Sequence, residues 1–380
     1  MRILITTDTY LPMIGGIPNA VLSLTQYLKS SKIFYRLIAP GPKVKDEEDV
    51  YRLTYFNDPF IKGKTGAIFP LAFFQIRDII KKDDPTVIHI EEAGGIGVSS
   101  LFWGKIYRKK IIGTVHTDPK QVAKINNFFR LIPFLEVLIK KYLVFFYNKC
   151  DVITTPGESY LKNMNFSKKT VVIPNGVDLT EYFPAIQKNN SFLAKYNLPS
   201  NKKIFLYLGR LDPDKNIEFL IRSFAKLNRD DSILLIVGVG ALASYLKLLV
   251  SSYHNIIVIF EHDQKDIPCF YRNSDVFVTA SKIEVQSLTA LEAMASGLPI
   301  IAARAGGMVD LCKDSVNGFL FKPDDFNDFI DKTEKILKNK VKFSQMKKES
   351  RRLAEEHDLN RCMQKYVDLY KYLQQDSNNI

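Results

Sequence analysis

Short runs of apolar and β-branched residues alternate with amphipathic stretches along the whole chain. The strands expected in the first half are RILITT, YRLIAP, VIHI, IIGTVHT, DVITTP and TVVIPN. A Gly-Gly loop follows the first strand, and a helix is expected from about Asn19 to Lys29. Apolar strands that alternate with helices are typical of a parallel sheet with helices on its faces.

The pattern breaks once and then restarts. Residues 184–203 read PAIQKNNSFLAKYNLPSNKK, a polar run with prolines that we interpret as a linker zone. The strands expected beyond it are KIFLYLG, SILLIVG, NIIVIF, VFVTA, PIIAA and GFLF. At 380 residues the chain also exceeds the size at which a single core usually divides.

These patterns predict an α/β protein with two doubly wound, Rossmann-like domains. We place the first domain at 1–185 and the second at 186–360. A C-terminal helix at 361–380 is expected to pack back on the N-terminal domain. Ligands bind such sheets beyond the carboxyl ends of the strands, so a central cleft between the two domains is the expected site.

Composition narrows the class of protein. The net charge of +12 indicates an acidic partner, such as a phosphorylated small molecule, an anionic lipid surface or nucleic acid, although a generally basic proteome would explain it equally well. The four cysteines lie far apart without a CxxC pair, which suits a reducing compartment. The apolar start is too short for a signal-peptide core, and the apolar run 131–147 is broken by three charges. We expect a cytoplasmic protein.

Two cations follow a strand in LYLGRLDPDKNIEFLI, where Arg210 and Lys215 precede a helix. Cations beside a helix N-terminus can bind a diphosphate through charge-assisted hydrogen bonds. Two ordinary surface side chains are the alternative. Gly15 and Gly16 in PMIGGIPNAV form a second candidate anion site, because glycines let backbone approach a ligand closely. A plain tight turn explains them equally well.

A glycine-rich run, IVGVGALASYL, carries Gly238, Gly240 and Ala243 after a strand. Glu261 lies about twenty residues further on, so the run resembles a dinucleotide-binding fingerprint. Such fingerprints usually follow the first strand of a fold, whereas this one lies inside the second unit. We therefore interpret it as a loop that lines a nucleotide.

His116 ends a strand in GTVHTD, where its ring would face the expected cleft. Asp118 could orient that ring or cap the next segment, and a histidine held by core hydrogen bonds is the alternative. In SKIEVQSLTALEAMASG, Glu284 precedes a helix that begins near Leu288, and Glu292 lies inside it. Carboxylates accept hydrogen bonds from vicinal diols, so the two could hold two sugars. One loop acid and one acid favoured by the helix dipole are the alternative.

Taken together, these features strongly resemble glycosyltransferase family 4, retaining enzymes of the GT-B fold. The resemblance covers nearly the whole chain. Its motifs are YLPMIGG, VHTD, VIPNGVD, LGRLDPDKN, IVGVG, the two glutamates at their seven-residue spacing, and GLPIIAARAGGMVDLCKDSVNGFLF.

The resemblance implies a donor site for a nucleotide sugar, a UDP- or GDP-hexose, on the C-terminal domain and an acceptor site on the N-terminal domain. Arg210 and Lys215 would neutralise the leaving diphosphate. Glu284 would hold the donor sugar's hydroxyls, and His116 would bind its hydroxymethyl end. Together these four would be the catalytic residues.

The remaining donor-binding residues follow from the same resemblance. Glu292 would hold the ribose hydroxyls, and Gly16 and its neighbour Gly15 would give backbone N–H groups to the diphosphate. The other donor-binding positions are Gly238, Ser287 and Leu288.

Two departures from the family pattern bear on substrate. Where the family commonly has Gly-Phe-Gly after the first glutamate, this chain has Val285, Gln286 and Ser287. That variant resembles the glycosyltransferases that act on diacylglycerol. The strand end expected at the base reads FEHDQ rather than a glycine-rich run, which leaves the base open.

The implied chemistry is hexose transfer with retention at the anomeric carbon. Asp212 and Asp214 form a D-x-D string, which metal-dependent transferases of another fold use. Here it lies beside the diphosphate lysine, so we interpret it as a loop and expect no metal and no other cofactor.

The acceptor is inferred from residues 120–149, where Lys and Arg lie among Phe, Leu and Tyr. This mixture suits a helix on anionic lipid head groups, so we expect a lipid acceptor at the inner face of the cell membrane and no nucleic acid partner. A core helix with snorkelling lysines is the alternative. Other readings are a transferase to a soluble sugar or polysaccharide, a sugar-nucleotide epimerase, a nicotinamide oxidoreductase and a non-catalytic binding module.

Overall fold

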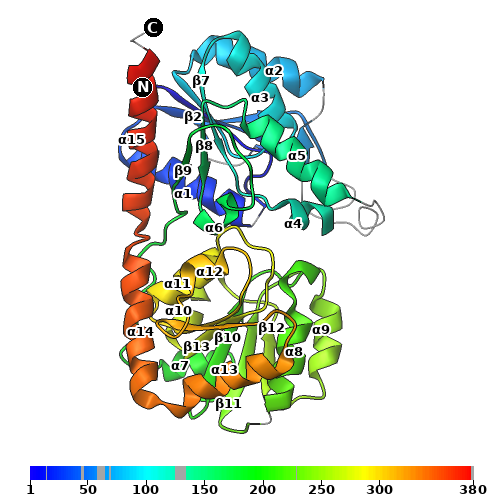
Figure 1. The fold of residues 1–380 in the computed structure, drawn as a ribbon, viewed down its shortest axis with the longest axis vertical. Coiled ribbons are helices and arrows are strands. Elements are labelled where there is room, and N and C mark those ends of the chain that lie inside the picture. The colour runs from blue at the N-terminus through cyan, green and yellow to red at the C-terminus, as the bar shows by residue number, and fades with distance from the viewer. Residues whose placement is uncertain are drawn as a thin grey trace. The chain divides into compact units, whose positions relative to one another are not determined.

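A computed structural model of the chain describes residues 1–13, 15–43, 47–57, 65–67, 70–124, 134–227 and 229–377. The chain forms two compact units, of which one comprises Met1–Asn175 with Asn360–Ile380 and the other Gly176–Leu359. Figure 1 shows the ribbon of both, each a parallel sheet with helices around it.

The first unit is built on a seven-stranded sheet in the order β3-β2-β1-β6-β7-β8-β9. Every neighbouring pair in it runs parallel. Its strands are β1 (Ile3–Thr6), β2 (Tyr35–Pro40), β3 (Val50–Leu53), β6 (Val87–Ile90), β7 (Lys110–Thr114), β8 (Val152–Thr155) and β9 (Thr170–Val172). The central strands are buried on both faces, which explains their continuous apolar sequence.

Helices and one small hairpin complete the first unit. The antiparallel pair β4 (Tyr55–Asn57) and β5 (Thr65–Ala67) lies apart from the main sheet. The helices are α1 (Gly16–Ser30), α2 (Leu71–Asp83), α3 (Gly95–Ile106), α4 (Pro119–Lys124), α5 (Leu135–Tyr147), α6 (Glu158–Leu161) and α15 (Leu359–Ser377).

The second unit is built on a six-stranded parallel sheet in the order β12-β11-β10-β13-β14-β15. Its strands are β10 (Lys203–Leu208), β11 (Ser232–Val237), β12 (Ile256–Ile259), β13 (Val276–Thr279), β14 (Ile300–Ala303) and β15 (Gly318–Phe321). Two apolar clusters pack on its two faces. The fold class expected from the sequence, two doubly wound Rossmann-like units, is confirmed.

The helices of the second unit cover both faces of its sheet. They are α7 (Asn190–Lys195), the 3-10 turn η2 (Pro213–Lys215), α8 (Ile217–Leu227), α9 (Ala243–Val250), the 3-10 turn η3 (Gln264–Asp266), α10 (Ile267–Arg272), α11 (Leu288–Ala295), α12 (Met308–Leu311), α13 (Phe326–Lys338) and α14 (Lys340–Glu355).

The segment interpreted as a linker zone belongs to the second unit instead. Helix α7 lies within it, and Phe192, Leu193 and Leu198 are buried in a core cluster of that unit. The boundary between the units falls at Asn175, ten residues before the expected 185. The linker interpretation was wrong because the few buried residues of this segment lie among Asn, Lys and Ser and do not form a long apolar run.

The last helix, α15, is red in Figure 1 and belongs to the first unit. Its sequence alternates buried and exposed positions at helical spacing, as expected for a surface helix with one apolar face. The buried face comprises Cys362, Met363, Tyr366, Val367, Leu369, Tyr370 and Leu373. Tyr27 of α1 donates a hydrogen bond to Gln364 at 2.7 Å, so the helix lies against α1.

One strand of the main sheets was not anticipated. The edge strand β3 reads VYRL, of which three residues are only partly buried. A short, half-exposed strand with an arginine in it carries little apolar signal. The small hairpin of β4 and β5 was also missed, because each of its strands is only three residues long.

If α15 is held by its apolar face, truncating a buried residue will destabilise the first unit. Leu373→Ala is expected to lower the free energy of unfolding by about 2–5 kcal/mol, since Leu373 is 3% exposed. The exposed neighbour Lys371 is the matched control, and Lys371→Ala should change stability by less than about 0.5 kcal/mol. Urea denaturation of both variants measures the difference; equal stabilities would contradict the packing.

Candidate active site

In the second unit, pairing of β10 with β13 brings two predicted residues together. Phe205 and Leu206 lie beside Val276 and Phe277, so the loops that follow the two strands leave the same edge of the sheet. Lys215 donates from Nζ to Glu284 Oε1 at 2.7 Å across these loops, although the two residues are 69 positions apart.

The Lys215 ammonium lies in a mostly enclosed and acidic environment. Its side chain is 12% exposed, and its second carboxylate neighbour is Asp214 at 3.4 Å. Burial alone would lower the pKa of Lys215, but the charges of Glu284 and Asp214 outweigh it and raise the pKa. Lys215 therefore keeps a full positive charge near neutral pH, as a diphosphate-binding cation requires.

The predicted cation Arg210 lies beside the D-x-D string. It pairs with Asp212 and also contacts Asp214 at 3.4 Å, and its side chain is 44% exposed. Asp212 accepts a hydrogen bond from the Ala241 backbone N–H at 3.0 Å. Both aspartates are therefore engaged in holding the loop.

Gly238 is required by close backbone packing. It has φ +155°, and a Cβ there would lie 1.9 Å from the Gly209 carbonyl oxygen. The loop after β11 consequently packs against the loop that carries Arg210. The Leu242 backbone N–H also donates to the Leu211 carbonyl at 2.9 Å. Close backbone packing thus explains the glycines of IVGVG without a nicotinamide cofactor.

A second glycine pair supports Glu284. Gly307 donates its backbone N–H to the Glu284 carbonyl at 2.6 Å. Gly306 has φ +51°, and a Cβ there would lie 2.6 Å from the same carbonyl oxygen. The Ala-Gly-Gly run after β14 therefore shapes the loop that presents Glu284. The family resemblance includes this run but implies no role for it.

Helix α11 begins at the expected residue, Leu288, with Ser287 as its N-cap. The Ser287 hydroxyl accepts from the Ala290 N–H at 3.3 Å, which stabilises the first turn. Glu292 lies one turn further along, where Tyr271 donates its hydroxyl to Oε2 at 2.7 Å. The two glutamates are thus carried by the loop before α11 and by α11 itself.

Glu292 holds its proton more tightly than an ordinary glutamic acid. Burial raises its pKa to about 7, aided by the charge of Glu181 and opposed by hydrogen bonds from Tyr271 and Tyr182. Because the pKa is raised in the folded state, this group's contribution to stability is full below its ordinary pKa and is lost as pH rises through about 7.

In the first unit, α1 begins at Gly16 with Gly15 as its N-cap residue. A Cβ at Gly16 would meet nothing within 4 Å, so this glycine has no packing reason among the described residues. Open space beside a helix N-terminus is compatible with the expected anion site.

His116 lies just beyond β7, and its Nε2 is 2.7 Å from Glu91 Oε2. Both side chains are almost fully buried, with 6% of His116 and 4% of Glu91 exposed. Glu91 follows β6, the neighbour of β7 in the sheet. Sequence reasoning missed Glu91; the signal was an acid directly after the buried strand VIHI.

The segment 120–149 is only partly described, since 125–133 lie outside the described residues. Helix α5 buries Leu143, Phe146 and Tyr147 and leaves much of its apolar surface exposed. The exposed apolar residues on and just before it are Phe134, Val137, Leu138, Tyr142 and Phe145.

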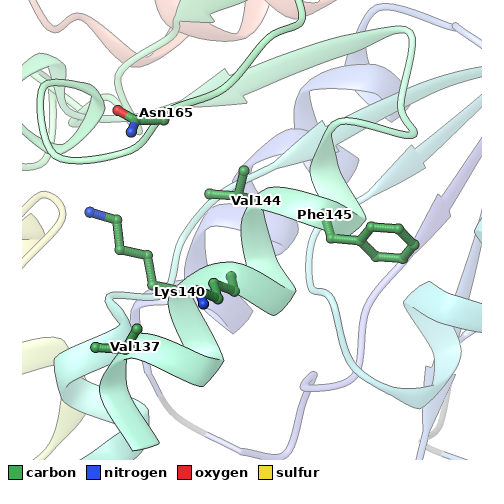
Figure 2. A pocket seen from close by; sticks show the side chains of 6 residues that line it. Val137, Lys140, Val144, Phe145 and Asn165 are labelled. Atoms are coloured by element: carbon green, nitrogen blue, oxygen red, sulfur yellow. The ribbon is translucent and has the colours of Figure 1, made fainter. Parts of the chain in front are cut away.

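Lysines and apolar residues of α5 line an open pocket of about 390 Å³. Figure 2 shows Val137, Lys140, Val144 and Phe145 on α5, and all four line the pocket. Asn165 also lines the pocket. The helix therefore presents a surface that is both basic and apolar.

Neither a metal cluster nor a membrane span is found in the described part of the chain. No group of three or more His, Cys, Asp or Glu side chains is arranged to hold a metal ion there. Within the same residues, every helix is too short or too polar to cross a bilayer.

Comparison of this chain with known proteins identifies its class of enzyme. The family model for glycosyl transferases group 1 matches residues 188–353, and that for Glycosyltransferase Family 4 matches residues 14–181. A GDP-mannose-dependent alpha-mannosyltransferase of Corynebacterium glutamicum is 26% identical, over 91% of this chain and 83% of that protein. An alpha-monoglucosyldiacylglycerol synthase of Streptococcus pneumoniae is 26% identical, over 84% of this chain and 75% of that protein.

A glycosyltransferase crystal structure from Rickettsia africae has the same fold, with a TM-score of 0.77, 22% identity and 98% of each chain covered. The two parallel sheets and this likeness define the GT-B fold. The chain belongs to the glycosyltransferases that the two family models describe and transfers a sugar from a nucleotide sugar. The oxidoreductase and binding-module readings are therefore wrong.

Loss of the Lys215 ammonium should remove the cation nearest Glu284 and slow transfer. Lys215→Ala is expected to lower kcat by about a hundredfold or more, as for other groups that stabilise developing charge. Lys282, whose ammonium pairs with Asp324 at 2.6 Å, is the control because it is close in sequence to Glu284. Lys282→Ala should stay within about threefold of wild type, a ratio worth less than 1 kcal/mol. Similar turnover in both variants would contradict the assignment of Lys215.

Donor binding should depend on the ionisation of Glu292. A carboxylate accepts hydrogen bonds from both hydroxyls of a diol more strongly than the neutral acid does, so affinity for UDP-glucose or GDP-mannose should rise between about pH 6 and pH 8 as Glu292 ionises. The diphosphate of a nucleotide sugar has no ionisation in this range and does not interfere. Calorimetry across the range measures this dependence for wild type and Glu292→Gln. A pH dependence unchanged in the variant would contradict the role.

Proposed function

We propose that this protein is a retaining hexosyltransferase that moves a hexose from a nucleotide diphosphate sugar to a membrane glycolipid precursor such as diacylglycerol. The observation that carries the lipid part is the exposed apolar and basic surface of α5. The name of the streptococcal relative, an alpha-monoglucosyldiacylglycerol synthase, supports the same acceptor class.

The donor residues of the second unit would act mainly through charge. Arg210 and Lys215 offset the negative charge that grows on the diphosphate as the sugar leaves. Both cations already have acidic partners, so the diphosphate competes with Asp212 and Glu284 for them. We propose that Glu284, once released, accepts hydrogen bonds from the donor sugar's hydroxyls.

Retention follows from the side on which the acceptor attacks. The acceptor hydroxyl approaches the anomeric carbon on the face that the diphosphate leaves, and a leaving phosphate oxygen takes the proton. The new glycosidic bond then has the configuration of the broken one. No enzyme carboxylate is required as a nucleophile in this scheme.

The acceptor side rests on the chemistry of α5. A bilayer surface accepts apolar side chains such as Val137 and Phe145 into its interfacial region. Lys140 and Lys141 would meet anionic head groups, each contributing about 1 kcal/mol. We therefore propose that the reaction takes place at the inner face of the cell membrane.

The direct test combines donors and acceptors. Purified protein is incubated with radiolabelled UDP-glucose, UDP-galactose or GDP-mannose, and with diacylglycerol vesicles, soluble sugars or no acceptor. NMR of the product gives its anomeric configuration. An α-linked lipid product from an α-linked donor supports the proposal. A β-linked product would contradict retention, a product with soluble sugars alone would replace the lipid acceptor, and an altered donor without acceptor would indicate an epimerase.

We expect transfer to proceed without a divalent ion. Because protein cations are proposed to meet the diphosphate, activity should persist within about twofold in excess EDTA. The measurement is initial rate with and without the chelator, on protein dialysed beforehand. Loss of activity that manganese or magnesium restores would contradict this expectation.

Binding to membranes should need both the lysines and the apolar residues of α5. Sedimentation with vesicles containing phosphatidylglycerol is expected, with release at high salt because the Debye length falls to roughly 3 Å at 1 M. Charge reversal at Lys140 and Lys141 should weaken binding by at least about tenfold. A matched reversal at Lys247 and Lys265, which are exposed in the second unit, should not. Wild-type protein that stays in the supernatant would contradict a membrane acceptor.

A further inference from the structure

A chain of buried polar groups runs through the first unit to His116. Glu91, directly after β6, is its centre. Glu91 donates its backbone N–H to the Thr6 carbonyl at 2.9 Å, so its position is fixed by the neighbouring strand β1. Its carboxylate reaches His116 through Oε2 at 2.7 Å and lies 3.5 Å from His89 through Oε1.

The Glu91–His116 contact determines where the His116 proton lies. Burial alone would raise the pKa of Glu91, but the neighbouring His89 and the hydrogen bond from His116 outweigh it and hold the pKa below its ordinary value. An ionised carboxylate can only accept a hydrogen bond. Nε2 of His116 therefore carries a proton, and when the ring holds only that one proton, Nδ1 keeps a lone pair.

Nδ1 of His116 has no hydrogen-bond partner among the residues that the structure describes. A ring held at one nitrogen and unpaired at the other is arranged to accept a hydrogen bond from a ligand hydroxyl. The opposite tautomer would present an N–H there and could not accept.

The far side of the network anchors Glu91 in turn. His89 is fully buried, with Nδ1 2.7 Å from the Tyr370 hydroxyl and Nε2 2.6 Å from Thr114 Oγ1. Burial lowers the pKa of His89, and the charge of Glu91 opposes this effect. Tyr370 belongs to α15, so the C-terminal helix supplies a group to the network behind His116.

We propose that Glu91 is a positioning residue that holds the His116 ring with Nε2–H toward the protein and Nδ1 as the acceptor for a hydroxyl of the donor sugar. This inference rests on the proposed function, because it assigns a chemical form to the histidine that the donor sugar would contact. Glu91 itself touches no substrate and acts through His116.

A double-mutant cycle separates positioning from a purely structural role. Glu91→Gln keeps the size of the side chain but can turn its amide N–H₂ toward Nε2 and reverse the tautomer. We expect kcat to fall by about 10–100-fold, as for outer partners that orient ligating histidines. In a His116→Ala background the same change should alter kcat by less than about twofold. Equal losses in both backgrounds would overturn the inference.

A second measurement needs no activity, and it reads the tautomer in the wild-type protein. Heteronuclear NMR of wild-type protein labelled at histidine nitrogen reports which ring nitrogen of His116 carries the proton. The Nε2–H tautomer is expected, with the His116→Ala spectrum assigning the signal. The Nδ1–H tautomer would overturn the inference even if transfer is normal. The Nε2–H tautomer in a protein that transfers no sugar would instead contradict the proposed function and leave the arrangement of Glu91 and His116 standing.

Discussion

In each of the two main sheets the strands run parallel, and this brings the carboxyl ends of all strands of that sheet to one edge. The loops that leave this edge carry the candidate residues: Glu91 and His116 follow β6 and β7, while Lys215 and Glu284 follow β10 and β13. Residues that are far apart in sequence therefore become neighbours when they follow adjacent strands, even in short loops. The backbone glycines that let these loops pack, such as Gly238 and Gly307, belong to the same constraint.

The charged side chains of the candidate sites are compensated differently in the two units. In the second unit, Arg210 and Lys215 each have a carboxylate partner, and the side chains of the Lys215–Glu284 pair are 12% and 20% exposed. An anionic donor that displaces such a carboxylate brings its own negative charge to the cation, so the cation is not left unpaired. In the first unit, the Glu91 carboxylate is 4% exposed and needs its hydrogen bonds permanently. Breaking that contact would leave a buried charge unpaired, which suits a fixed scaffold better than an exchangeable site.

The sequence predicted the fold because buried parallel strands have continuous apolar runs that need no tertiary information. It failed where burial and sequence diverge, at the half-exposed strand β3 and in the segment around α7, whose buried Phe192 and Leu193 lie among polar residues. The residues Lys215 and Glu284 were identified one by one, but their contact depends on the order of β10 and β13 in the sheet, which no local pattern contains. No local sequence pattern indicated that Tyr271 would be the hydrogen-bond partner of Glu292.

The role of α15 follows from the same argument about buried polar groups. A histidine as enclosed as His89 needs a partner at each ring nitrogen, and the strands supply one through Thr114. The second partner, the Tyr370 hydroxyl, comes from the last helix of the chain, 281 residues away. The helix is therefore tied to the first unit by a polar contact as well as by its apolar face. Since His89 lies 3.5 Å from Glu91, the end of the chain and the residue that holds His116 share one buried network.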